Sequence, residues 1–201
     1  MSQSPVIPRD ALPVHVTGSR HPLWWGMIML IVIEFTVFAS LIVSYFYYRA
    51  GSLVWPLGGI ARPSLLLPTI GEGLMLVSGA TMYWGYRGIK AGDRRRLMIG
   101  LAVSWLLAAA FLALKVIEYS GLDYRWDTNA YGSLVWTISG FHAGHTISVL
   151  IFTAVVFVLT WQGYFRADRY LGVQINTLYW LYVVIVSLPV YATIYLSPYV
   201  L

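Results

Sequence analysis

Cysteine is absent from this sequence, and charged residues are scarce. The chain has 201 residues, no Cys and 10% charged residues, whereas an ordinary soluble domain carries roughly 25%. The missing cysteines exclude disulfides, thiolate metal sites and iron–sulfur clusters. The shortage of charge, together with 59% hydrophobic residues and a mean hydropathy of +0.70, indicates a membrane protein.

Long apolar runs make up most of the chain. A membrane-spanning helix needs roughly 20 apolar residues at about 1.5 Å each. The stretches that meet this requirement are about 23–48, 66–86, 97–119, 133–161 and 173–197. We therefore predict an all-α membrane protein, with five transmembrane helices forming a single domain over residues 23–201. Residues 1–22 are polar and rich in proline, and we expect them to form a cytoplasmic arm. The connections are too short for a soluble catalytic domain.

The basic residues lie between the apolar segments, so the net charge of +5 indicates topology rather than nucleic-acid binding. One set belongs to the arm and to the second and fourth connections: Arg9, Arg20, Arg87, Lys90, Arg94, Arg95, Arg96, Arg166 and Arg169. The other set is smaller: Arg49, Arg62, Lys115 and Arg125. Because cytoplasmic loops carry the excess of Lys and Arg, we expect a cytoplasmic N-terminus and a periplasmic C-terminus.

Carboxyl groups within the predicted spans are candidates for function, because an ionised group in hydrocarbon is costly. Glu34 lies about 17 Å into the first span, close to the bilayer midplane. It either holds helices together as a neutral carboxyl, handles protons or contacts lipid. Glu72 in the second span is flanked by Gly71 and Gly73, small residues that let another helix approach closely, and it has either an interfacial or inter-helix structural role or a functional one. Lys115 and Glu118 are three residues apart in the third span, a spacing that favours a structural ion pair.

His142 and His145 lie on one face of the fourth predicted helix, since residues three apart are neighbours on a helix surface. They are either hydrogen-bonded structural histidines or the beginning of a copper or zinc site, for which no third ligand is evident. The same helix carries small residues at four-residue spacing, a pattern typical of a close helix contact: Gly140, Gly144 and Ser148.

The stretch 131–145, YGSLVWTISGFHAGH, resembles subunit III of the haem–copper terminal oxidases, the family of cytochrome c and quinol oxidases. The family has Tyr-Gly-Ser, then Thr or Ser before Gly-Phe-His, and a second His three positions on. Other similarities extend the resemblance over about residues 23–197: Glu34, Pro68, Ser78-Gly79, Glu118-Tyr119 and Tyr179-Trp180. The chain is similar to the five-helix bacterial form of this subunit.

The resemblance implies a non-catalytic subunit of a proton-pumping oxidase in a bacterial inner membrane. Such a subunit packs on the catalytic subunit I, binds phospholipid, and supports proton uptake and stability. Subunit II and a small subunit IV are further expected partners, nucleic acid is not, and haem and copper belong to partner subunits rather than to this chain. Glu34 would be the carboxyl near proton uptake. The structural or lipid-contacting polar residues would be Glu72, Lys115, Glu118, His142, His145 and Trp180.

Several positions depart from the family pattern. Gly71-Glu72 replaces Asn-Thr, and Lys115 replaces a Gln. In the last predicted helix three positions where the family has Glu, His and Asp are occupied by Gln174, Leu181 and Val184. These departures leave two alternatives to an oxidase subunit: an accessory protein of nitric oxide reductase and a small proton-coupled transporter. A transporter would be expected to contain inverted repeats, which this sequence does not have.

Overall fold

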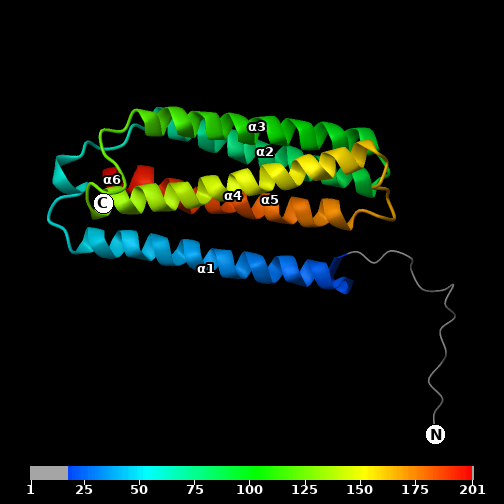
Figure 1. The fold of residues 1–201 in the computed structure, drawn as a ribbon, viewed down its shortest axis with the longest axis horizontal. Helices are drawn as coiled ribbons and strands as arrows, with labels where there is room; N and C mark the ends of the chain where they lie inside the picture. Colours follow the sequence, from blue (N-terminus) through cyan, green and yellow to red (C-terminus); the bar gives the residue numbers. More distant parts are fainter. Residues whose placement is uncertain (1–17, 201) are drawn as a thin grey trace, which may run out of the picture.

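The structure, a computed structural model, describes residues 18–200, so the predicted arm lies almost wholly outside the described residues. The helices are α1 (Pro22–Ala50), α2 (Leu66–Lys90), α3 (Arg94–Ser120), α4 (Ala130–Trp161), α5 (Leu171–Tyr191) and the short α6 (Ser197–Val200) (Figure 1). The first four predicted spans lie within α1 to α4, and the fifth runs from α5 into the short segments that follow. The predicted all-helical fold is therefore confirmed for the described residues.

Four segments are long and apolar enough to cross a membrane: α1, α3, α4 and residues 171–200. The helix α2 is not among them. Its 25 residues would reach about 37 Å, but Thr69, Glu72 and several glycines lower its hydropathy. The chain is thus an integral membrane protein built from helices.

Short, capped turns set the antiparallel order of the helices. Only residues 91–93 separate α2 from α3, and Gly92 adopts a φ of +80° that favours glycine. Asp93 then caps α3 by accepting a hydrogen bond from the backbone N–H of Arg96 at 2.9 Å. Asn129 caps α4 in the same way. The two turns return the chain directly, so α2 packs along α3 and α3 packs along α4.

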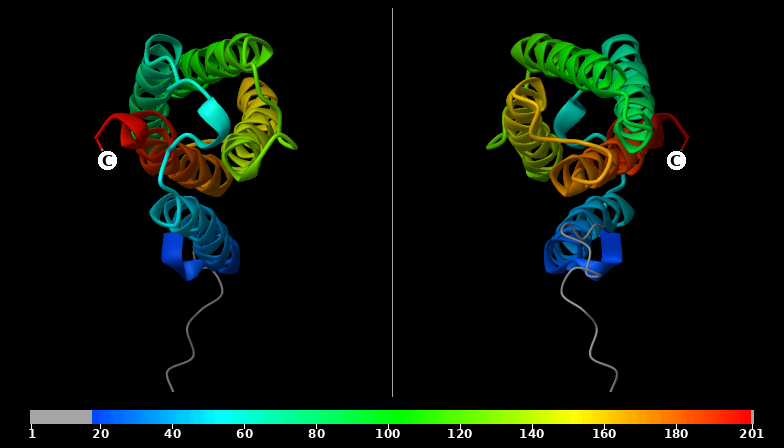
Figure 2. Two further views of the ribbon diagram at one scale, coloured as in Figure 1. Left: turned by 90° about the vertical axis from the view of Figure 1, so that its left-hand side faces the viewer. Right: turned by 90° about the vertical axis from the view of Figure 1, so that its right-hand side faces the viewer.

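Helices α2, α3, α4 and α5 surround a common core, and α1 lies outside them against α4 and α5 (Figure 2). Of the residues of α1, Phe38 and Tyr45 are buried, whereas Ile33, Phe35 and Val43 are exposed. Most of α1 therefore presents apolar side chains outward, towards lipid or a partner.

The end of α5 departs from regular α-helix. Pro189 lies inside α5, and a π-helical segment, η4 (Ala192–Leu196), follows it. The N–H of Ser197 bonds the carbonyl of Ala192 five residues earlier. Proline cannot donate to the helix ladder, and such local π turns accommodate the interruption. The segment carries Tyr195 into the core between α3 and α5, where it becomes part of the site described below.

Candidate functional site

The structure distributes the predicted site residues over two intramembrane clusters and one separate contact. We name the first the α1 cluster, formed by Glu34, His145 and Tyr179. The second, the interior cluster, lies among α2 to α5 and its members are Glu72, Lys115, Glu118, Ser139, His142, Ser187 and Tyr195. Trp180 belongs to neither cluster.

Glu34 joins α1 to α4 and α5. Its Oε1 accepts a hydrogen bond from the hydroxyl of Tyr179 at 3.2 Å and lies 3.4 Å from Nε2 of His145. Its Oε2 is buried and has no hydrogen-bond partner among residues 18–200. The carboxyl therefore has one oxygen bonded within this chain and a second, buried oxygen that is left without a partner in the described residues.

The hydrogen bonds of His145 show where a proton must lie. Its Nδ1 is 2.7 Å from the carbonyl oxygen of Phe141, which can only accept, so Nδ1 carries a proton. In a neutral ring Nε2 is then an acceptor facing Glu34. A hydrogen bond between these groups needs one more proton, carried either by the carboxyl or by the imidazole. Glu34 Oε1 and His145 Nε2 thus lie close enough that one added proton would join them.

Aromatic rings surround the α1 cluster. The ring of Phe38 lies 5.2 Å from that of His145 and 5.1 Å from that of Phe141, as measured between centroids. Phe38 is 2% exposed and is one of the two buried residues of α1. The Glu34 contact is therefore made inside an apolar helix interface, where electrostatic interactions are stronger than in water.

Lys115 and Glu118 form the predicted ion pair, with 3.0 Å between Nζ and Oε2. The sequence does not predict the third member of this contact, Tyr195. Its hydroxyl accepts from Lys115 Nζ at 2.6 Å and donates to Glu118 Oε1 at 2.6 Å. The three groups thus form a closed triangle that ties α3 to the π-helical segment.

Glu72 is buried in the same region. The hydroxyl of Ser187 donates to its Oε1 at 2.8 Å, which links α2 to α5. Of the two flanking glycines, Gly71 meets another helix closely: a Cβ there would lie 3.2 Å from the ring of Phe111. Nothing lies within 4 Å of a Cβ at Gly73. The close approach predicted around Glu72 therefore occurs on one side only.

His142 is hydrogen-bonded, which agrees with the alternative that the two histidines are structural rather than metal ligands. Its Nε2 donates to the carbonyl of Val183 at 3.1 Å, and its ring packs edge-on against Phe111. It points into the interior cluster, whereas His145 points to Glu34. The two rings therefore do not converge on one ligand, and within residues 18–200 no group of three potential metal-binding side chains occurs.

Trp180 links two regions that the sequence analysis identified separately. Its Nε1 donates to Ser78 Oγ at 3.1 Å, and both side chains are buried. Next to Ser78, a Cβ at Gly79 would lie 3.2 Å from Val184. These motif residues therefore hold α2 against α5. Their contact is structural within this chain.

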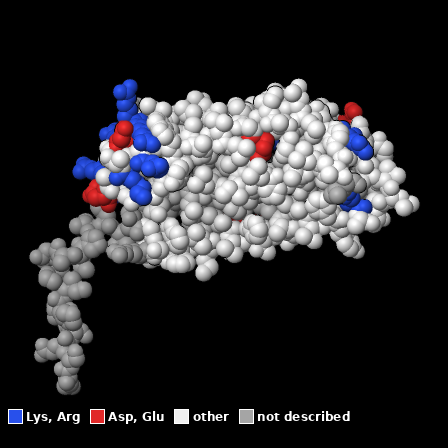
Figure 3. Space-filling model, turned by 180° about the vertical axis from the view of Figure 1, so that it is seen from behind, with Lys and Arg blue, Asp and Glu red and all other residues white. Residues whose placement is uncertain are grey.

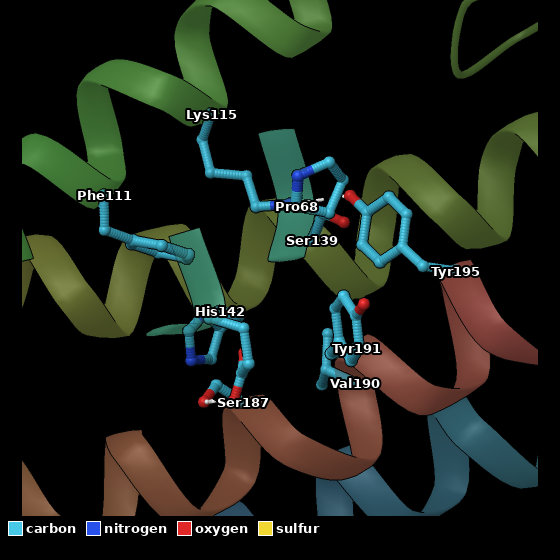
Figure 4. A pocket seen from close by; sticks show the side chains of 10 residues that line it. Pro68, Phe111, Lys115, Ser139, His142, Ser187, Val190, Tyr191 and Tyr195 are labelled. Atoms are coloured by element: carbon cyan, nitrogen blue, oxygen red, sulfur yellow. Dashed lines mark hydrogen bonds between the residues drawn. The ribbon is translucent and has the colours of Figure 1, made fainter. Parts of the chain in front are cut away.

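A small cavity lies inside the interior cluster (Figure 4). A wider one opens at the end of the bundle formed by the 51–65 and 121–129 connections, and the two share Pro68 and Tyr195. Burial raises the pKa of Tyr124, in the wall of the wider cavity, to about 12, so this phenol stays protonated at neutral pH.

Comparisons with known proteins give a consistent result. The sequence profile of the family described as Cytochrome c oxidase subunit III matches residues 9–199. Cytochrome c oxidase subunit 3 of Pylaiella littoralis is 30% identical over 188 residues, which cover 90% of this chain and 69% of the relative. The proteins of the same name from Synechocystis sp. and Cyprinus carpio are 27% and 29% identical, over 86% and 90% of this chain and 74% and 72% of the relatives.

Proposed function

Because this chain belongs to the cytochrome c oxidase subunit III family and is thus a subunit III of a haem–copper oxidase, we propose that it is non-catalytic and that Glu34 supports proton uptake by the catalytic subunit. Membership also means that the chain belongs to a multi-subunit complex. Its partners would be subunit I, which would hold the haem and copper, subunit II and a small subunit IV.

The α1 cluster carries this proposal. Glu34 and His145 lie close enough that one added proton would join them, and Glu34 Oε2 is buried without a partner in the described part of the chain. The helix that bears Glu34 is also the one least covered by the others. A small shift of α1 on binding a partner subunit would let a water or a partner group reach this buried oxygen, which would couple Glu34 to events outside the chain.

Phospholipid is the other proposed ligand. A groove between α3 and α4 is lined almost entirely by apolar groups, including Leu101, Trp105 and Phe157. Such a surface suits an acyl chain, and exposed aromatic residues near both ends of the bundle suit the interfaces of a bilayer. We assign the protein to a bacterial inner membrane, with its N-terminus in the cytoplasm.

Purification tests the complex. The tagged chain should be isolated in mild detergent together with a large many-helix subunit, haem absorbance and oxygen uptake. The electron donor that supports oxygen uptake would separate a cytochrome c oxidase from a quinol oxidase. A complex that reduces nitric oxide instead of oxygen, or a chain that purifies alone without haem, would contradict the proposal.

The variant Glu34→Gln tests the proposed role of this carboxyl. It keeps the shape of the side chain but removes the proton site, so we expect slower proton uptake, weaker pumping or a shorter catalytic lifetime. The matched control is Ser40→Ala on the same helix, because the Ser40 hydroxyl bonds only its own helix, at Thr36 O. If Glu34→Gln equals wild type in all three measurements, the role assigned to Glu34 is wrong.

A further inference from the structure

The small cavity of the interior cluster has the size and the lining of a water site. Its volume, measured as the space open to the centre of a water molecule, is about 20 Å³, and about 10–15 Å³ suffices for one water. Glu72, Lys115, Ser139 and His142 all line it, from three different helices. A buried water needs two to four polar partners, and this wall offers them.

Ser139 gives a second, independent indication of a ligand. Its side chain is 6% exposed. The Tyr119 hydroxyl lies near its Oγ, but no contact of Oγ in the described part of the chain meets hydrogen-bond geometry. Other buried hydroxyls of α4, at Thr146 and Thr160, bond a carbonyl one turn earlier. A buried hydroxyl left without a partner costs about 1–3 kcal/mol, so Ser139, which faces the cavity (Figure 4), needs a partner there.

The hydrogen bonds of Ser187 are compatible with a proton on Glu72. The Ser187 hydroxyl has one proton but two acceptors within reach: Val184 O at 2.6 Å and Glu72 Oε1 at 2.8 Å. If Glu72 is neutral, it can donate to Ser187 Oγ while Ser187 donates to Val184 O, and both contacts are satisfied. If Glu72 is ionised, the one Ser187 proton has to be shared between Glu72 and Val184 O in a three-centre hydrogen bond.

The surrounding charges favour the same state. The titratable groups that line the cavity with Glu72 are Lys115 on α3, His142 on α4, Tyr191 at the end of α5 and Tyr195 on the π-helical segment. Lys115 already pairs with Glu118, and no cation lies within 4 Å of Glu72 in the described chain. An ionised Glu72 would therefore leave an uncompensated negative charge within the bundle, which is costly.

The triangle of Lys115, Tyr195 and Glu118 connects this cavity with the end of the bundle. Lys115 lines the small cavity, Glu118 lines the wider one, and Tyr195 lines both. The two contacts of the Tyr195 hydroxyl, each 2.6 Å long, are short charge-assisted hydrogen bonds. A series of hydrogen-bonded groups therefore runs from the wider cavity to Lys115, which lines the small cavity together with Glu72.

We propose that the small cavity binds one water molecule and that Glu72 is a proton-binding site loaded from the wider cavity through Glu118, Tyr195 and Lys115. Lys115 passes a proton through the water to the Glu72 carboxylate. The Tyr195 hydroxyl, which donates to Glu118 in the structure, then turns to Lys115 and reprotonates it. Glu118, having taken a proton from a hydronium ion in the wider cavity and left it as water, returns one to Tyr195. The net change is one proton moved to Glu72, with no other bond altered. This proposal goes beyond the role of Glu34 and does not depend on it.

Infrared spectroscopy tests the site on the full chain, in whatever complex it purifies. Wild-type protein should have a carboxylic-acid C=O band that Glu72→Gln removes and that shifts when H₂O is exchanged for D₂O. The shift should be several-fold slower in Tyr195→Phe, which removes the relay hydroxyl but keeps the ring. Ser139→Ala, which keeps every charge, should change the frequency of the Glu72 band because the water loses a partner.

The control is Glu34→Gln, which should leave the Glu72 band and its exchange rate as in wild type. The proposal is overturned if Glu72→Gln removes no acid band at any pH at which the protein is intact, or if Tyr195→Phe exchanges at the wild-type rate. A wrong oxidase assignment would instead be seen when the tagged chain is purified, as a complex without haem or oxygen uptake. It can therefore be distinguished from a failure of the Glu72 proposal, which is seen in the infrared spectra.

Discussion

At the scale of single residues, polar side chains act here as links between helices. The indole of Trp180 reaches Ser78 on α2, and the amide oxygen of Asn176 accepts from Thr153 on α4 at 2.9 Å. Hydrogen bonds between membrane helices contribute about 0.6–2 kcal/mol each. Each link is modest, but each fixes one helix at a defined level and rotation relative to another.

The Trp180 link leads to a prediction. In Trp180→Phe the indole N–H is lost, Ser78 loses an interhelical partner and part of a fully buried volume is left empty. We expect the free energy of unfolding in detergent to fall by about 1–3 kcal/mol. Thermal unfolding should be compared with Trp161→Phe, because Trp161 is 68% exposed and its ring can be reduced at little cost. Equal stability of the two variants would contradict the assigned role of Trp180.

Single residues also show how far the sequence leads. Glu34, Glu72 and the Lys115–Glu118 pair stand out because charge is rare in apolar runs, and the structure places all of them in polar clusters. Tyr195 cannot be found in this way, since 15 tyrosines occur in the chain and many lie near helix ends. Its position depends on the π turn after Pro189.

At the scale of elements, the sequence predicts the helices better than their contacts. The stripe Gly140, Gly144 and Ser148 predicts a close helix contact, but it faces outward on α4, and nothing lies within 4 Å of a Cβ at either glycine. The tight contact is instead between Gly85 of α2 and Gly100 of α3. Four-residue spacing shows that small residues share one helix face, but it does not show which helix packs there. For α2 and α3 the three-residue turn between them decides this.

This contact predicts a specific sensitivity of the α2–α3 pair. A Cβ at Gly100 would lie 2.6 Å from the Cα of Gly85 and 2.9 Å from Thr81 O. These are backbone atoms that cannot move aside, so Gly100→Ala should push the helices apart and destabilise the protein by about 1–3 kcal/mol. Gly140→Ala is the matched control, with an expected gain of up to about 1 kcal/mol from helix propensity. Unfolding in denaturing detergent would measure both, and a harmless Gly100→Ala would refute the close approach.

At the scale of the whole molecule, the Lys and Arg side chains visible in Figure 3 gather at the two ends, with an acidic group between them. One end, formed by the α2–α3 and α4–α5 connections, carries Arg94, Arg95, Arg96, Arg166 and Arg169, with Arg87 and Lys90 one turn inside α2. The opposite end carries Arg49, Arg62 and Arg125. This asymmetry supports a cytoplasmic location for the first end. The orientation requires α2 to cross the membrane as the fifth span, although its own hydropathy is low.

A cysteine-accessibility experiment tests the orientation and the crossing of α2 together. The chain contains no Cys, so each introduced thiol is the only one to react within it. Leu53, in the connection before α2, is fully exposed, and Ala91 is exposed in the turn after α2. A maleimide that cannot cross membranes, added to intact cells or vesicles of known orientation, should label Leu53→Cys from the outer side. It should label Ala91→Cys only after the membrane is opened.

Two further cysteine positions test the orientation of the bundle without relying on whether α2 crosses the membrane. Asp127→Cys, between α3 and α4, should behave as Leu53→Cys does, and Ala167→Cys, between α4 and α5, should behave as Ala91→Cys does. Inverse labelling of all four positions would mean that the orientation is reversed while the five crossings stand. Equal labelling of Leu53→Cys and Ala91→Cys would mean that α2 does not cross. In that case Glu72 could lie near one membrane surface, where an ionised carboxylate is tolerated. Glu72 would then need no proton to be stable, so the same experiment also tests a premise of the proposed proton-binding site.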